Sequence, residues 1–140
     1  MWTALVLAAL AAACTDAVLP VLTTWQATLQ PTSPAQRVLG EVAVLSQSGR
    51  AETSIKIFRS DPGVTYAWRI LTGACGVQGD AVAGRAVYPQ LEAGSDGVAE
   101  GRTTLSRELD AEGSYAAWLF QRGAGGTESV AACGVLQRQR

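Results

Sequence analysis

Three kinds of residue in this chain could do chemistry: its cysteines, a cluster of carboxylates and a glycine-rich loop. Cys14, Cys75 and Cys133 are the cysteines, and a thiolate can act as a nucleophile or bind a soft metal. The sequence has no histidine, so it can build no Ser-His or Cys-His pair, no imidazole base and no histidine metal site. If Cys14 is lost to processing, two thiols are left, and they lie far apart in sequence. We therefore expect no metal site.

The carboxylates and the glycines have simpler structural explanations. Glu108, Asp110 and Glu112 alternate with apolar residues in "RELDAEG" beside a turn glycine, which is typical of a solvated connection. The segment "RGAGGTES" lacks the lysine of a phosphate-binding loop, and no helical pattern follows it. We therefore expect a hairpin loop there, no cofactor, and a protein that is not an enzyme.

The opening "MWTALVLAALAAAC" is apolar throughout, too short to cross a bilayer as a helix, and ends in small residues. Residues 1–13 are predicted to be a signal peptide. A cysteine after small residues is similar to the bacterial lipobox, so Cys14 is predicted to be lipidated and to become the mature first residue. Simple secretion, with Cys14 merely near the cleavage site, and an ordinary buried Cys14 thiol are the alternatives.

This interpretation places the protein in the bacterial cell envelope, lipid-anchored on the periplasmic side, or else secreted or soluble in the periplasm. Residues 14–23 then form a tether. With Cys14 lipidated, Cys75 and Cys133 remain as an even pair in an oxidising compartment, where a disulfide is expected. Two independent buried thiols are the alternative.

The charge balance makes nucleic acid an unlikely class of partner. The chain has 11 basic and 12 acidic residues, and no basic run or stripe stands out. We expect no nucleic-acid partner.

Beyond the tether, apolar residues recur with period two between turn signals, which is typical of half-buried strands. The expected strands cover residues 25–29, 38–45, 54–57, 66–71, 82–88, 98–105, 114–121 and 129–136. Seven to eight short strands predict an all-β, antiparallel sandwich or flattened barrel over residues 24–137, with 138–140 as a solvated tail. Trp25, Trp68 and Trp118 lie within these strands, so we expect them to pack in the core rather than to stack on a sugar.

Two segments around the cysteines resemble the copper/zinc superoxide dismutase superfamily. "AACGVL", Ala131 to Leu136, resembles that family's last strand, which carries half of an intrasubunit disulfide. Pro62-Gly63 and Gly73-Ala74-Cys75 stand at the spacing of the family's P-G-L-H-G-F-H-V-H-E-F-G-D-C. The likeness covers Thr24 to Leu136, and the related chordin-type extracellular domain is a more distant match. The resemblance implies a Greek-key fold and a Cys75–Cys133 disulfide.

The same resemblance argues against dismutase activity. On this spacing the family's two copper-binding histidines fall at Trp68 and Ile70, which cannot coordinate copper, and its anion-guiding arginine falls at Val130. Asp96 is near the place of the zinc-binding aspartate, although a turn aspartate is the better interpretation. Trp68 and Ile70 share a strand face with Tyr66, so an apolar cluster is expected to replace the family metal site.

These observations lead to one leading hypothesis: a non-catalytic, metal-free, superoxide dismutase-like binding or structural domain of an exported bacterial lipoprotein. Its expected partners are the membrane, through the lipid anchor, and an envelope protein or a polysaccharide. A copper/zinc dismutase-type enzyme with an unrecognised site and a periplasmic carrier of a small ligand are the alternatives.

Overall fold

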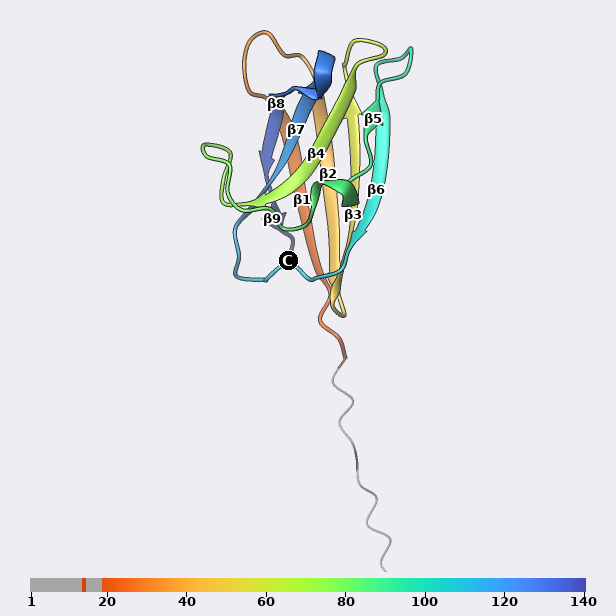
Figure 1. Cartoon of the computed structure of the whole chain (residues 1–140). Coiled ribbons are helices and arrows are strands. Elements are labelled where there is room, and N and C mark those ends of the chain that lie inside the picture. Colours follow the sequence, from red (N-terminus) through yellow and green to blue (C-terminus); the bar gives the residue numbers. More distant parts are fainter. Residues whose placement is uncertain (1–13, 15–18) are drawn as a thin grey trace, which may run out of the picture.

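The computed structural model describes Cys14 and residues 19–140 (Figure 1). The expected signal peptide, residues 1–13, and residues 15–18 of the expected tether lie outside the described residues. The strands are β1 (Thr23–Pro31), β2 (Leu39–Gln47), β3 (Arg50–Phe58), β4 (Thr65–Thr72), β5 (Leu91–Glu92), β6 (Ala99–Leu105), β7 (Tyr115–Arg122), β8 (Glu128–Val135) and β9 (Gln137–Arg138). Two short 3-10 helices complete the elements, η1 (Arg85–Val87) and η2 (Ala124–Gly126). No helix among the described residues is long and apolar enough to cross a membrane.

The strands form one antiparallel sheet that curls into a nearly closed barrel. Their order is β5-β4-β7-β8-β1-β2-β3-β6, with β9 paired to β1 beside β8. Figure 1 shows the sheet wrapped around a common interior, with β5 and β6 at its two free ends. The predicted all-β, antiparallel fold class is therefore confirmed.

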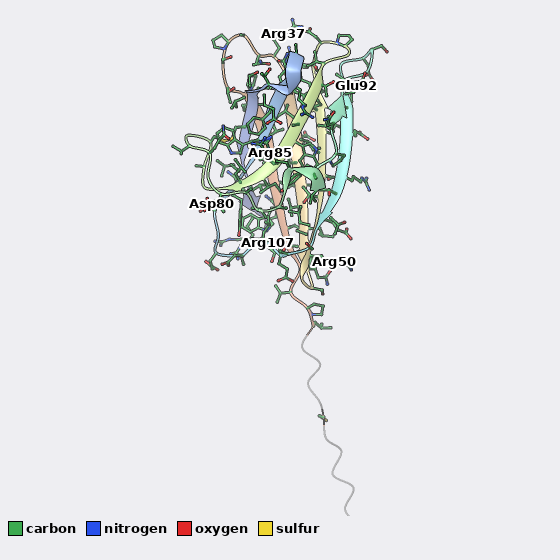
Figure 2. All side chains as sticks on the ribbon, viewed as in Figure 1. Arg37, Arg50, Asp80, Arg85, Glu92 and Arg107 are labelled. Atoms are coloured by element: carbon green, nitrogen blue, oxygen red, sulfur yellow. A yellow bond between two sulfur atoms is a disulfide. The ribbon has the colours of Figure 1, made fainter. Side chains whose placement is uncertain are left out.

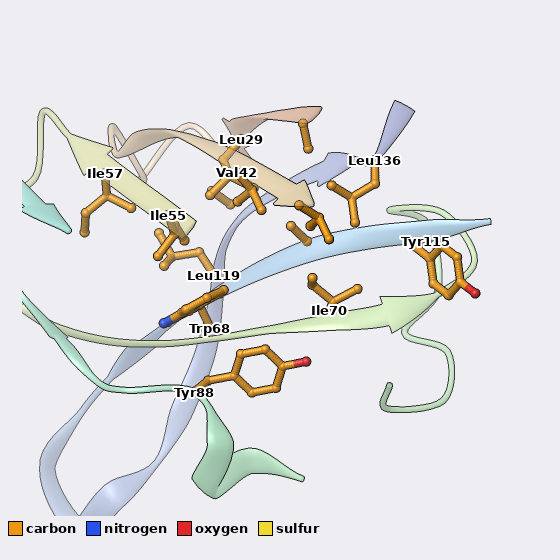
Figure 3. Packing of buried hydrophobic residues seen from close by; sticks show 14 of the residues in the cluster. Leu29, Val42, Ile55, Ile57, Trp68, Ile70, Tyr88, Tyr115, Leu119 and Leu136 are labelled. Atoms are coloured by element: carbon orange, nitrogen blue, oxygen red, sulfur yellow. The ribbon is translucent and has the colours of Figure 1, made fainter. Parts of the chain in front are cut away.

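Period-two alternation places one side of each long strand inside the barrel. In β1, for example, Trp25, Ala27 and Leu29 are 3%, 7% and 0% exposed, and Gln26 and Thr28 between them are exposed. The interior packs aliphatic side chains from both halves of the barrel together with a few aromatic rings (Figure 3). All three tryptophans predicted to be in the core are buried.

The segment between β4 and β5 corrects one predicted element. Residues 82–88 were expected to form a strand, but the segment contains η1 and only an isolated bridge from Ala81 to Leu71. Val82 and Tyr88 are still buried, at 5% and 6% exposed, because they fill the side of the barrel where β5 and β6 do not pair. Apolar residues therefore recur here without a strand.

Hydrogen bonds fix this plugging segment on both sides of the opening. The indole Nε1 of Trp68 donates to the carbonyl oxygen of Pro89 at 2.8 Å, and the rings of Trp68 and Tyr88 meet edge to face with centroids 5.0 Å apart. Across the opening, Thr103 Oγ1 of β6 donates to the carbonyl oxygen of Val87 at 2.7 Å. The plug therefore links β4 to β6 across the opening.

The expected tail, residues 138–140, is exposed, but its first residue belongs to a strand. Gln137 and Arg138 are exposed, but they form β9, which pairs with β1, and the amide of Gln139 donates to the carbonyl oxygen of Thr24 at 2.8 Å. The end of the chain therefore lies beside the start of β1. As Figure 1 shows, the chain enters and leaves the barrel at the same end.

Candidate functional site

Most of β4 and β7 and the middle of β8 are buried on both faces. Their outward side chains form a second apolar cluster, here called the outer cluster: Leu71, Ala116, Trp118, Phe120 and Cys133, with Ala67, Cys75 and Val130 packed against them. In the run "YAAWLF" of β7, the side chains that point inward and those that point outward are all apolar or aromatic. Both faces of this part of the strand are therefore buried. The rings of Trp118 and Phe120 stack with centroids 6.3 Å apart.

A disulfide lies at the edge of the outer cluster. Cys75 and Cys133 are bonded, with Cα atoms 5.8 Å apart and 58 residues apart in sequence. The predicted pairing is confirmed. The bond ties the loop after β4 to β8, where Cys133 stands opposite Trp118 in the β7–β8 ladder.

A buried ion pair crosses the same face. Arg69 points outward from β4, its guanidinium carbon lies 4.0 Å from the centre of the Phe120 ring, and its Nη2 donates to Glu128 Oε2. The side chains of Arg69 and Glu128 are only 6% and 17% exposed. Burial lowers the pKa of Arg69, and the negative charge of Glu128 opposes that shift. Figure 2 shows Arg85 on η1, whose Nη1 comes within 3.9 Å of the same Glu128 oxygen.

The sequence analysis missed this ion pair. The alternation that puts Trp68 and Ile70 on one face of their strand leaves Arg69 on the other, but nothing in the sequence of that strand distinguishes a buried outer face from an exposed one. The sequence of β7 did indicate a buried outer face, because a strand with apolar side chains on both faces must be covered on both. Arg69 lies opposite Trp118 of that strand and shares its covered face.

The other half of the barrel has a bare outer face, formed by the outward side chains of β1, β2, β3 and β6. Paired residues form polar rows across it, such as Thr28, Glu41, Lys56 and Glu100. An open depression of about 720 Å³ lies on this face, and Ala43 and Ser54 are among the residues that line it.

Trp68 and Ile70, where the resemblance places copper ligands, lie inside the barrel. They are 1% and 0% exposed and share the inner face of β4 with Tyr66, which is 3% exposed. Each packs in the main core, as Figure 3 shows. Their side chains therefore do not reach the surface.

Two other sequence-predicted positions lie apart from the outer cluster. Cys14 is exposed and is not in a disulfide, which contradicts the alternative of a buried thiol. Asp96 has the turn role: its Oδ1 accepts a hydrogen bond from the amide of Val98 at 3.1 Å.

The carboxylate cluster also has a structural role. Glu108 Oε1 accepts from the amide of Gly49 at 2.8 Å, and Asp110 Oδ1 accepts from the amide of Glu112 at 3.0 Å. All three carboxylates are exposed. The glycine-rich segment forms the loop of the β7–β8 hairpin, as predicted. Across Cys14 and residues 19–140, no three His, Cys, Asp or Glu side chains come together in a way that could hold a metal.

Two tyrosines have shifted titrations. Burial raises the pKa of Tyr66, and the hydrogen bond of its hydroxyl with Ser60 Oγ, 2.7 Å long, works in the opposite direction. Burial also raises the pKa of Tyr88. Both hydroxyls therefore stay protonated at neutral pH, and neither provides a tyrosinate base.

Comparison with known proteins adds no relative. A scan against protein-family models and a search of curated proteins gave no match to this chain.

Proposed function

We propose that this chain is a non-catalytic, metal-free, superoxide dismutase-like domain with a binding or structural role, carried by an exported bacterial lipoprotein. One observation carries the proposal. The two positions where the resemblance calls for copper ligands are occupied by Trp68 and Ile70, both packed in the core of a chain without histidine. A dismutation cycle needs a bound redox metal, and these side chains supply no ligand for one.

The strand order supports the Greek-key and dismutase-like part of the proposal. Consecutive strands β1, β2 and β3 pair in a meander, and the chain then skips past β6 and β5 to form β4. It skips again between β6 and β7. Two such crossings in one antiparallel sheet are typical of Greek-key folds, and the disulfide joins the two cysteines that the resemblance singles out.

The alternatives have less support. An enzyme with an unrecognised site would need a free acid or base at that site, but Glu108 and Asp110 accept hydrogen bonds from backbone amides and Glu128 is bonded to Arg69. A carrier would need a cleft lined by the tryptophans. Trp68 and Trp118 are 1% and 4% exposed in packed clusters, and neither lines the depression on the bare face.

The anchor part of the proposal rests on Cys14. It is exposed, and it precedes the end of the barrel at which β1 begins. A lipid on Cys14 would hold this end toward the membrane. The loops at the other end, such as residues 32–38 and 59–64, would then face the periplasm together with both outer faces (Figure 1).

One preparation tests both parts of the proposal. The full chain and its Cys14→Ser variant are expressed in bacteria, fractionated and purified, and their metal content and dismutase activity are measured after incubation with copper and zinc. We expect the parent chain in the membrane fraction, and Cys14→Ser released or with its signal peptide uncleaved. We also expect neither activity nor stoichiometric metal.

Each part fails separately. One tightly held metal per chain would contradict the metal-free assignment. An unmodified amino terminus downstream of Cys14, found by mass spectrometry, would contradict the lipoprotein assignment and leave the metal result standing.

A further inference from the structure

Two arginines contact one carboxylate on the covered outer face, and a third stands across the β7–β8 ladder from it. Arg69 bonds to Glu128 Oε2, Arg85 Nη1 lies 3.9 Å from that oxygen, and Arg122 stands opposite Glu128 in the β7–β8 ladder. The positive charges of Arg85 and Arg122 also act on Arg69, whereas Glu128 is the one carboxylate that does. The cluster therefore has a formal charge of about +2, in a chain whose net charge is −1.

The cluster also has more hydrogen-bond donors than acceptors. A guanidinium carries five N–H donors, yet the bond to Glu128 is the one hydrogen bond found for the Arg69 side chain among residues 19–140. In the same part of the chain Arg85 and Arg122 make no hydrogen bond through their side chains. The Arg85 side chain is 76% exposed and Arg122 is partly exposed, so their donors can meet a ligand from solvent.

The buried members hold the arrangement in place. Phe120 supports the Arg69 guanidinium at 4.0 Å, and Glu128 neutralises that buried charge. The same carboxylate attracts Arg85, which is on the plugging segment, so one acidic side chain orients donors from two separate parts of the chain. Glu128 is thus a positioning residue.

We propose that Arg85 and Arg122, with Arg69 beneath them, form a binding site for one oxyanion group of a ligand, a phosphate, a sulfate or a carboxylate. Planar guanidinium donors match the geometry of such groups and bind them in charge-assisted pairs. A phosphate dianion would balance the excess charge of the cluster, so phosphate is expected to bind more tightly than a single carboxylate. The inference depends neither on lipidation of Cys14 nor on the family assignment.

The test is calorimetric titration of the purified full chain with inorganic phosphate in a buffer free of other multivalent anions. We expect saturable binding that weakens with added sodium chloride, because exposed charges are screened. Arg85→Ala and Arg122→Ala should each weaken binding about tenfold, the loss of one charge-assisted contact. The double variant should show none. Arg85→Lys should fall between, since it keeps the charge and loses the planar fork.

Arg102→Ala is the matched control, because Arg102 is an exposed arginine that lines the depression on the bare face. It should bind phosphate like the parent chain. Equal losses from Arg102→Ala and Arg85→Ala would overturn the proposal, since they would indicate attraction to charge in general. Absence of binding by the parent chain to phosphate, sulfate and acetate would also overturn it.

A final comparison identifies the source of the anionic group. Polygalacturonate carries many carboxylates on one polysaccharide, whereas inorganic phosphate carries its charge alone. If the protein binds polygalacturonate more tightly than inorganic phosphate, and the Arg85→Ala and Arg122→Ala double variant loses this binding, the site is assigned to an acidic polymer. Binding of phosphate alone, lost in the same variant, would assign it to a small anion. Because all parts of the test use anions without added metal, they remain informative if the proposed function fails.

Discussion

The two outer faces of this barrel differ although both belong to one sheet. The face of β4, β7 and β8 is covered, with a stacked aromatic pair, a disulfide and a buried ion pair. The face of β1, β2, β3 and β6 is bare and polar. Both faces enclose the same core cluster. The difference therefore shows that the covered face has interactions beyond those that form the core.

One ion pair on each face makes the contrast concrete. Lys56 Nζ and Glu100 Oε1 on the bare face are 3.6 Å apart, with side chains 53% and 69% exposed. Arg69 and Glu128 are 6% and 17% exposed. Water and salt screen the first pair and reach little of the second, so charge at Glu128 matters for folding and charge at Glu100 hardly does.

The disulfide should give the largest effect. Replacing Cys75 with alanine opens a loop of 58 residues, and the loop-closure entropy regained by the unfolded chain should lower the free energy of unfolding by about 4 kcal/mol. Denaturant unfolding of the purified chain measures this. Cys14→Ser is the control, because it changes an exposed cysteine outside the barrel, and it should leave the midpoint unchanged. Equal stability of Cys75→Ala and the parent chain would remove the disulfide from the account of this face.

The two ion pairs should differ next. Glu128→Gln leaves the buried Arg69 charge without its counter-charge and should lower the free energy of unfolding by about 2 kcal/mol. Glu100→Gln, the same chemical change on the bare face, should cost less than about 0.5 kcal/mol. Both are measured by denaturant unfolding at low and at high salt. A loss at Glu100 as large as at Glu128 would show that the faces do not differ electrostatically.

In the bare half the sequence predicts both the strands and the faces of their side chains, whereas in the covered half it predicts the strands and the disulfide but not the buried outer face. β1, β2 and β3 alternate strictly between buried and exposed residues, and a period of two determines which side chains point inward. In β7 the residues on both faces are buried, so alternation cannot show which side chains point into the barrel. The cover on that face comes from residues far away in sequence, such as Cys75, and no local pattern encodes such contacts.

The lack of a local pattern also explains which site residues could be predicted and which could not. The cysteine pair was predictable because the chain has three cysteines, and the expected lipidation of Cys14 left one even pair. Arg122 faces Glu128 across the β7–β8 hairpin, whereas Arg69 reaches Glu128 because β4 pairs with β7 and β7 with β8, and Arg85 reaches it from the plugging segment. The prediction of a strand at residues 82–88 was wrong for a related reason. Burial of Val82 and Tyr88 comes from filling the open side of the barrel, and period-two counting cannot distinguish that from a strand.

The smallest effects come from adding two methyl groups to each face. Ala116 points outward from β7 and is fully buried, whereas Ala43 points outward from β2 and is exposed. Ala116→Val must push apart the packed cover and should lower the free energy of unfolding by about 1–2 kcal/mol. Ala43→Val meets water instead, and because valine favours strands, its effect should stay within about 0.5 kcal/mol of zero, with either sign.

Paired denaturant curves at one pH compare the two alanine variants directly, and circular dichroism checks that each keeps the barrel. The pair tests packing alone, since neither substitution changes a charge or a sulfur atom. A cost at Ala43 that matches the cost at Ala116 would mean that the bare face is covered in solution. Its depression would then be the first place to look for what covers it. A negligible cost at Ala116 would mean instead that the cover over β7 yields easily, and the difference between the faces would rest on the disulfide and the ion pair.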